Sequence, residues 1–188
     1  MMQRGLHQEV RSPRRGVANA VFQHVAPSNE FPKDKWDALV SLLLTSLFLL
    51  AKYSWPHLRD SERGRFIAIA STHALVASPF KIGYVSAKHG VLGLVKALAL
   101  EGAEHGIASV AFALALFASS WSSAKSSPGQ GAQPPEERVL NNGIPAPHAI
   151  RRLIEPEEVA AAVAMLLGPR GSCSPARLFT MDLGWTAR

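Results

Sequence analysis

Residues 65–71 read Arg-Phe-Ile-Ala-Ile-Ala-Ser, a short apolar run that ends in a hydroxyl group. A run of this length without polar alternation is typical of a strand that is buried on both faces of a parallel sheet. Ligands of open α/β sheets bind beyond the carboxyl ends of the strands. We therefore expect a buried strand that carries Ser71 to a binding or catalytic edge.

The segment after this strand contains a tyrosine and a lysine four residues apart, Tyr84 and Lys88, at the head of a helical pattern over residues 85–104. Side chains at this spacing lie on the same face of a helix. An ammonium group beside a phenol favours the ionised phenol, so we expect the pKa of Tyr84 to be lowered. A tyrosine of this kind can take and return protons. Together with Ser71, it predicts chemistry that interconverts an alcohol and a carbonyl group.

The spacing of these three residues resembles the active-site signature of the short-chain dehydrogenase/reductase family. Three further stretches are similar to the 3-hydroxybutyrate dehydrogenase branch of that family: residues 22–27 (FQHVAP), 73–81 (HALVASPFK) and 184–188 (GWTAR). The likeness extends over about residues 19–188. It implies an α/β fold, a partial Rossmann-like doubly wound parallel sheet that lacks the first β-α-β units.

The resemblance also implies an NAD-dependent oxidoreductase acting on a small 3-hydroxy acid such as 3-hydroxybutyrate, which it would convert to acetoacetate. In the family's scheme Tyr84 is the general acid and base, Lys88 lowers the tyrosine pKa and holds the nicotinamide ribose, and Ser71 orients the substrate oxygen. The cofactor-binding residues expected from the resemblance are Asn19, Tyr84, Lys88 and Ser119. Those expected to hold the carboxylate and methyl group of the substrate are Gln23, His73, Lys81 and Trp185.

Several positions depart from the family pattern on the cofactor side. No Gly-x-x-x-Gly-x-Gly or Gly-x-Gly-x-x-Gly turn precedes Asn19, Val21 stands where the family has glycine, and residues 114–115 (Leu-Ala) replace a Pro-Gly pair. Leu43 stands where the family has an asparagine that holds the catalytic lysine through water, and leucine cannot hydrogen-bond. The sequence therefore leaves two hypotheses open: an enzyme, or a catalytically inactive truncated remnant that at most associates with related subunits.

The chain divides into a leader and one domain. We expect residues 1–18 to form a basic, disordered leader and residues 19–188 to form the C-terminal portion of a dehydrogenase domain. The helix over 85–104 is a candidate subunit interface of a homo-oligomer. The remaining elements are predicted as a helix over 31–53, strands over 65–70, 106–117 and 176–181, a helix that starts at Pro156 with its apolar body over 159–167, and a mobile loop over 119–135.

Composition limits the classes of partner. A chain of 188 residues that is 47% hydrophobic can form one domain with a substantial core. Much of the net charge of +6 comes from arginines near the N-terminus, and no basic groove with interleaved aromatic residues follows, so we expect no nucleic-acid partner. The single Cys173 allows no internal disulfide and no cysteine zinc cluster; we expect a cytoplasmic protein without a metal. Residues 38–51 are apolar but shorter than the roughly 20 residues that span a bilayer, so we expect a buried helix and no membrane partner.

Overall fold

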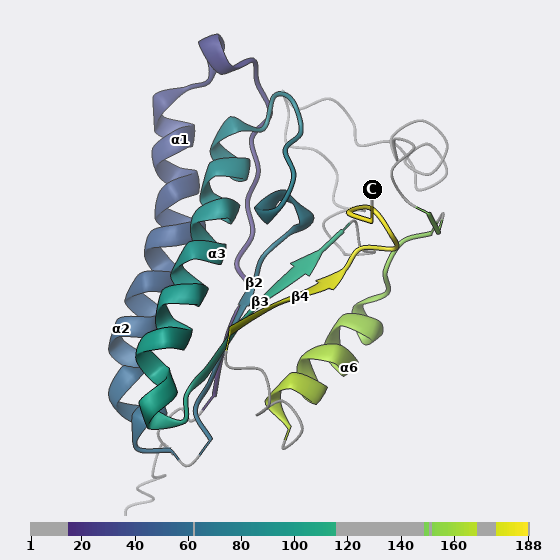
Figure 1. Cartoon of the computed structure of the whole chain (residues 1–188). Coiled ribbons are helices and arrows are strands. Elements are labelled where there is room, and N and C mark those ends of the chain that lie inside the picture. Colours follow the sequence, from purple (N-terminus) through teal and green to yellow (C-terminus); the bar gives the residue numbers. More distant parts are fainter. Residues whose placement is uncertain (1–14, 62, 116–148, 151, 169–175, 188) are drawn as a thin grey trace, which may run out of the picture.

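The fold is a three-layer α/β/α arrangement around a parallel sheet, seen in a computed structural model that describes residues 15–61, 63–115, 149–150, 152–168 and 176–187 (Figure 1). In the described residues the sheet has four strands in the order β1-β2-β3-β4, and every neighbouring pair is parallel. The strands are β1 (Arg15–Ala18), β2 (Arg65–Ile69), β3 (Ala108–Leu114) and β4 (Ala176–Met181). The predicted α/β fold with a doubly wound parallel sheet is confirmed.

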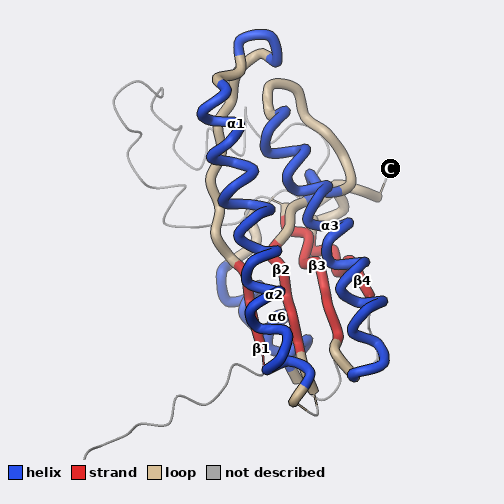
Figure 2. Tube along the Cα trace, turned by 90° about the vertical axis from the view of Figure 1, so that its left-hand side faces the viewer, coloured by secondary structure: helices blue, strands red, loops and turns tan. Residues whose placement is uncertain are grey.

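Helices connect the strands and cover both faces of the sheet. Helices α1 (Lys33–Val40) and α2 (Ser46–Arg59) join β1 to β2, and α3 (Ile82–Gly102) joins β2 to β3. The helix α6 (Pro156–Leu167) precedes β4. Figures 1 and 2 show α2 and α3 side by side on one face of the sheet and α6 on the opposite face. Short 3-10 segments lie at Ser28–Glu30, Thr72–Ala74 and Ala103–His105.

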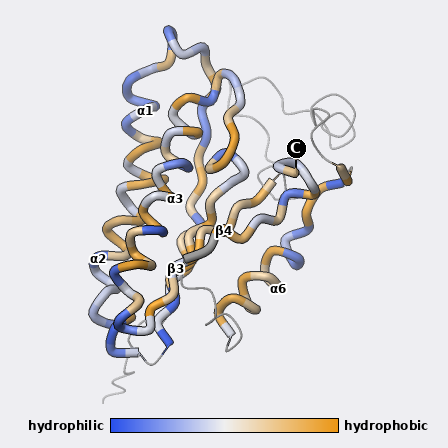
Figure 3. The backbone as a smooth tube through the Cα atoms, in the orientation of Figure 1, coloured by the Kyte–Doolittle hydropathy of each residue, from blue (hydrophilic) through white to orange (hydrophobic). Residues whose placement is uncertain are grey.

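The central strands are buried on both faces, which is why their sequences are continuous apolar runs. Phe66 and Ala68 of β2 pack in the cluster formed with α2 and α3, whereas Ile67 packs in the cluster that includes Leu166 of α6. In β3, Phe112 stacks on Phe179 of β4 with the ring centroids 5.1 Å apart. Figure 3 shows apolar residues along β3 and toward the C-terminal end of α6. Successive side chains of β2 and β3 therefore pack into two separate cores, one on each side of the sheet.

One continuous helix of 27 residues, Lys33–Arg59, contains α1, a π-helical turn at Ser41–Thr45 and α2. The N–H group of Ser46 donates to the carbonyl of Ser41, five residues back, which is the π-helical pattern. The buried side chains that follow one another at four-residue intervals along this helix are Leu39, Leu43, Leu47 and Ala51. The wide turn thus keeps one row of side chains facing the interior on both sides of it.

The sequence predicted a buried helix here, but the outward face of this helix is exposed. The helix is also longer than the apolar stretch seen in the sequence, and by length and composition alone it would suffice to cross a membrane. Its inner row packs into the protein core, but Phe48 is 51% exposed and Tyr53 is 69% exposed. A helix of a three-layer fold buries one side against the sheet, so an apolar sequence all round it leaves apolar side chains in solvent.

The strand β1 corrects the predicted extent of the leader. Arg15–Ala18 pairs in parallel with β2, from Arg15 opposite Arg65 to Ala18 opposite Ala68. The segment has little apolar periodicity because it lies at the edge of the described sheet, where its side chains are only partly buried. Backbone hydrogen bonds, rather than side-chain burial, hold it in place. Residues 1–14 and the predicted loop 119–135 lie outside the described residues.

The other predicted elements agree in type and differ by a few residues at their ends. The strand predicted over 65–70 ends at residue 69, and the strand predicted over 106–117 occupies Ala108–Leu114. The helix predicted over 85–104 begins at Ile82, which places Tyr84 inside its first turn. Helix α6 begins at Pro156, as predicted, with Glu155 and Glu158 forming a capping box.

Candidate active site

The candidate site lies at the carboxyl edge of the sheet, where β2 ends. Ser71 follows β2 and is the N-cap of the short 3-10 segment, because its Oγ accepts a hydrogen bond of 3.2 Å from the backbone N–H of His73. Trp185 follows β4 and its ring meets that of His73 edge to face, with centroids 5.5 Å apart. Two strand ends thus supply side chains to one place, as the parallel topology predicts.

Helix α3 brings Tyr84 and Lys88 to the same place. At Gly83 the helix approaches α1 so closely that an added Cβ would lie 2.8 Å from a methyl group of Leu39. The Lys88 ammonium donates a hydrogen bond of 2.8 Å to the carbonyl of Ile69, the last residue of β2, and lies 5.6 Å from the centre of the Tyr84 ring. Tyr84 is 8% exposed and Lys88 is 2% exposed. Ser71, Tyr84 and Lys88 therefore meet in one buried cluster, as the sequence predicted.

The electrostatics of this cluster correct one expectation. Burial raises the pKa of the Tyr84 phenol above its ordinary value, and a hydrogen bond with the Ser71 side chain opposes that rise. The Lys88 ammonium bonds to a backbone carbonyl and lies over the ring, and burial rather than this charge sets the direction of the tyrosine pKa shift. Burial also lowers the pKa of Lys88 from 10.5 to about 8. Desolvation, the larger effect here, therefore disfavours the charged forms of both groups.

His73 is the most connected residue of the predicted substrate-binding set. Its Nδ1 lies 3.4 Å from the Ser71 Oγ and its Nε2 lies 3.0 Å from the Ser78 Oγ. Its ring also meets the ring of Tyr84 edge to face, with centroids 5.6 Å apart. Burial, reinforced by the nearby positive charges of Lys81 and His89, lowers the pKa of His73 to about 4. The imidazole is consequently neutral at physiological pH.

Ser78 is a residue that sequence reasoning did not single out. It lies in a loop of mixed polarity, and no spacing rule pairs a serine with a histidine five residues earlier. Only the folded path of the loop, which returns from His73 to α3, brings its hydroxyl to the imidazole. The sequence signal that could have identified Ser78 was its position between Ser71 and Tyr84.

Lys81 is held at the edge of the site by an unusual backbone conformation. The preceding Phe80 has φ 65°, in the left-handed region that non-glycine residues seldom adopt, and its carbonyl accepts a hydrogen bond of 3.0 Å from the N–H of Ala26. Such a conformation costs on the order of 1 kcal/mol and is typical of functional sites. Burial lowers the pKa of the Lys81 ammonium, which is close enough to His73 to act on its charge.

The other predicted residues lie less centrally. Gln23 is half-buried in the segment after β1, and within the described residues its side chain makes no hydrogen bond to Ser71, Tyr84 or Lys88. Asn19 is exposed directly after β1, at the same edge of the sheet. Ser119 lies outside the described residues.

The donor set at this edge fits the nicotinamide ribose end of a dinucleotide. An ammonium group carries three protons to donate, and Lys88 directs one of them to Ile69. The phenol of Tyr84 and the amide of Asn19 add groups that bond to sugar hydroxyls or a carboxamide. The phosphate end of a dinucleotide is usually bound by a glycine-rich turn at a helix N-terminus, and the sequence contains no such turn ahead of Asn19.

Comparison with known proteins agrees with this fold. The family profile for short chain dehydrogenases matches residues 17–128. The chain therefore belongs to the short-chain dehydrogenase/reductase family, a family of oxidoreductases.

Within that family the chain is similar to proteins named D-beta-hydroxybutyrate dehydrogenase. It is 34% identical over 182 residues to the protein of Cupriavidus necator and 36% identical over 174 residues to that of Rhizobium meliloti, covering 92% of this chain and 67% of each relative. Among solved structures, 4-hydroxyisoleucine dehydrogenase complexed with NADH superposes with a TM-score of 0.80 at 20% identity, covering 94% of this chain and 70% of that one. The structural match supports the Rossmann-like fold.

Proposed function

We propose that the chain is an NAD-dependent oxidoreductase that interconverts 3-hydroxybutyrate, or a closely similar small 3-hydroxy acid, and the corresponding 3-oxo acid. The observation that supports this most strongly is the buried cluster of Ser71, Tyr84 and Lys88 beside His73 and Trp185. A site of this kind can hold a small carboxylate beside a group that exchanges protons. The similarity to the two D-beta-hydroxybutyrate dehydrogenases adds the substrate class.

The proposed mechanism divides the reaction between proton and hydride. When bound, NAD would supply the group that accepts or returns the hydride of the carbon that carries the hydroxyl. Tyr84 takes the hydroxyl proton of the substrate during oxidation and gives it back during reduction. Ser71 donates a hydrogen bond to the substrate oxygen, which holds that oxygen next to the phenol. Lys88 would hold the ribose hydroxyls, and its positive charge near the phenol would favour the ionised tyrosine.

The substrate carboxylate is assigned to the residues on the opposite side of the cluster. The Lys81 ammonium supplies the positive charge, and His73 and Gln23 supply neutral donors. Trp185 packs against the His73 ring and would bury the methyl group of a four-carbon acid. Asn19 and Ser119 are assigned to the cofactor. Since a reducing compartment keeps a lone Cys173 as a thiol, we place the protein in the cytoplasm.

Two measurements on the purified chain test this function. Fluorescence titration with NADH should show saturable binding, and NADH absorbance at 340 nm should fall when acetoacetate is added. Binding without turnover would favour the inactive remnant instead, and no binding at millimolar NADH would overturn the assignment to NAD chemistry.

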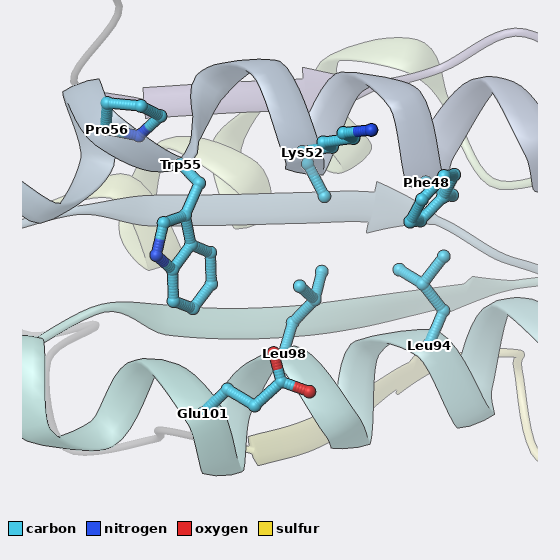
Figure 4. Close-up of a pocket in the computed structure, with 8 residues that line it drawn as sticks. Phe48, Lys52, Trp55, Pro56, Leu94, Leu98 and Glu101 are labelled. Carbon is cyan, nitrogen blue, oxygen red and sulfur yellow. The ribbon is translucent and has the colours of Figure 1, made fainter.

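We also propose that the chain forms a homo-oligomer through α2 and α3. Between these helices lies an apolar groove of about 370 Å³, lined by Phe48, Lys52, Trp55, Leu94, Leu98 and Glu101 (Figure 4). The groove carries a basic side chain on α2 and an acidic one on α3. A two-fold axis could set α2 of one copy against α3 of the other. Lys52 of each copy would then pair with Glu101 of the other, and the apolar side chains of both grooves would be buried.

A further inference from the structure

A tight turn after β4 brings Trp185 to the ring of His73. The turn begins at Asp182, and the backbone N–H of Trp185 donates a hydrogen bond of 3.0 Å to the Asp182 carbonyl. The two residues between them, Leu183 and Gly184, have φ 52° and 82°. Positive φ at both central residues suits glycine and asparagine, whereas leucine disfavours it. Leu183 therefore needs other contacts to hold this conformation.

The side chain of Asp182 provides such contacts on both sides of Trp185. Its Oδ1 accepts a hydrogen bond of 3.0 Å from the backbone N–H of Gly184. Its Oδ2 accepts one of 2.7 Å from the backbone N–H of Thr186 and a short one from the Thr186 hydroxyl. Hydrogen bonds to an ionised carboxylate are stronger than those between neutral groups. One carboxylate thus binds both neighbours of Trp185 in the chain.

The first half of the turn also rests on a second segment of the chain. The Leu183 carbonyl accepts hydrogen bonds of 2.9 and 3.2 Å from the backbone N–H groups of Ala149 and Ile150. Gly184 lies so close to this segment that an added Cβ would be 2.7 Å from the Cβ of Ala149. These contacts fix where the turn lies, and the bonds to Asp182 fix the residues on either side of Trp185.

The position of Trp185 matters because its ring forms part of the candidate site. The indole meets the His73 imidazole edge to face, with centroids 5.5 Å apart, and the Nδ1 of His73 lies 3.4 Å from the Ser71 Oγ. We propose that Asp182 is a positioning residue: its carboxylate holds Trp185 against His73 and thereby limits the length of the alkyl end of the 3-hydroxy acid. This inference rests on the proposed function, in which Trp185 buries the methyl group of the substrate.

The first test follows Trp185 itself and needs neither cofactor nor turnover. The chain is labelled with 5-fluorotryptophan, and the fluorine-19 NMR signal of Trp185 is assigned by its loss in Trp185→Phe. Asp182→Asn keeps the size of the side chain but loses its charge and one acceptor. In this variant the Trp185 signal should move at least about halfway to its position in the urea-unfolded chain. The signals of Trp36 on α1 and Trp55 on α2 should stay in place, as expected if the fold is retained.

Two variants of Thr186 separate the hydrogen bond from the charge. Thr186→Val removes the hydroxyl bond to Asp182 and leaves the carboxylate charged, so the Trp185 signal should move in the same direction by a smaller amount. Thr186→Ser keeps the hydroxyl and should not move the signal. The matched control is Asp60→Asn, which changes an exposed aspartate at the end of α2. An unmoved Trp185 signal in Asp182→Asn, or in Thr186→Val should the asparagine variant not fold, would overturn the inference.

The second test compares acetoacetate with 3-oxopentanoate, which is one methylene longer at its alkyl end. In Asp182→Asn the KM for acetoacetate should rise about tenfold with kcat nearly unchanged, because a contact with a methyl group that does not react contributes equally to binding the substrate and the transition state. One methylene in an apolar pocket changes kcat/KM by about tenfold or more, and this preference for acetoacetate should fall at least about threefold in the variant.

A lower kcat with an unchanged preference between the two acids would indicate a merely structural role for Asp182 and would overturn its role in substrate selection. An inactive wild-type chain would overturn the proposed function instead. The fluorine signal would still decide whether Asp182 holds Trp185, so the two failures are distinguishable.

Discussion

Two regions of this molecule reverse the usual distribution of polar and apolar groups. At the carboxyl edge of β2, Ser71, His73, Tyr84 and Lys88 are buried; the serine hydrogen-bonds the histidine and the tyrosine, and the lysine bonds the backbone and lies over the tyrosine ring. On the outer side of α2 and α3, the exposed Phe48 and the partly buried Trp55, Leu94 and Leu98 line an apolar groove. Burying polar groups and exposing apolar ones both reduce stability. Both regions are therefore expected to serve something other than stability: chemistry in the first, and association in the second.

The largest expected effect separates the two regions by function. Tyr84→Phe removes the proton-exchanging hydroxyl and should lower kcat by about 10³-fold. NADH binding should be retained because the ring and Lys88 remain. The assay is NADH oxidation with acetoacetate, and the matched control is Tyr53→Phe, which changes the exposed tyrosine on α2. Equal activity of both variants would remove Tyr84 from the mechanism.

A charge in the groove should abolish association and spare the site. Leu98→Glu places a carboxylate where the proposed second copy packs and should weaken self-association by about 100-fold, since burying an unpaired charge costs about 2–3 kcal/mol. Sedimentation velocity over a range of concentrations measures the change. Met165→Glu, at an exposed apolar position on α6, should leave the association intact. A wild-type chain that stays monomeric at high concentration would contradict the interface.

Two lysines allow a direct comparison of the regions. Lys81→Met removes the charge assigned to the substrate carboxylate and should raise KM for acetoacetate by about 30-fold, as expected for a lost charge-assisted hydrogen bond. Lys52→Met, in the groove, should leave KM unchanged and weaken only the association. Steady-state kinetics at varied acetoacetate distinguishes them, and a normal KM in the first variant would exclude Lys81 from the carboxylate site.

The smallest expected effect is an increase in the free energy of unfolding when Lys88 is replaced, with loss of function. Lys88→Met removes a buried amine whose pKa falls from 10.5 to about 8 on folding. Below pH 8 the amine is charged in both states, and burying that charge lowers the free energy of unfolding by its full amount. Between pH 8 and 10.5 the amine is neutral in the native state and still charged in the unfolded state. The loss of stability therefore shrinks as the pH rises through this range. After allowance for the lost bond to Ile69, the variant should be about 2 kcal/mol more stable at pH 7 and no more stable at pH 11.

Urea unfolding of Lys88→Met at the two pH values measures this difference. Lys96→Met, an exposed position on the same helix, should change stability by less than about 0.5 kcal/mol at either pH. A destabilised Lys88→Met variant at pH 7 would show that the ammonium contributes more through its bonds than its burial costs.

The sequence predicted those parts of the fold that depend on burial. The strands predicted over residues 65–70 and 106–117 were recognisable because each is dominated by a short apolar run. The edge strand β1 was missed because pairing through the backbone leaves little trace in side-chain pattern. The exposed half of α2 was misjudged because hydrophobicity alone does not show which side of a helix meets the core.

The sequence predicted that three side chains of the candidate site lie together, but it did not predict their pKa shifts. Ser71, Tyr84 and Lys88 were identified from spacing, and the structure brings them together. Spacing cannot show how deeply a group is buried or which partner it chooses, so the direction of the Tyr84 pKa shift was wrong. Ser78 was missed for the same reason: its partner depends on the path of a loop.

The π-helical turn at Ser41–Thr45 separates the two regions along a single helix. Leu39, before the turn, and Leu43, within it, share a core cluster with Tyr84 and form a wall of the site; after the turn, Phe48 and Trp55 line the groove. Each residue of an α-helix turns the chain by about 100°. Deleting one residue within the turn would rotate α1 against α2 by roughly that angle and withdraw the wall from Tyr84, with the groove unchanged. The turn therefore acts as a spacer through which a change of length can reshape the candidate site without altering the groove that we propose as the contact between copies.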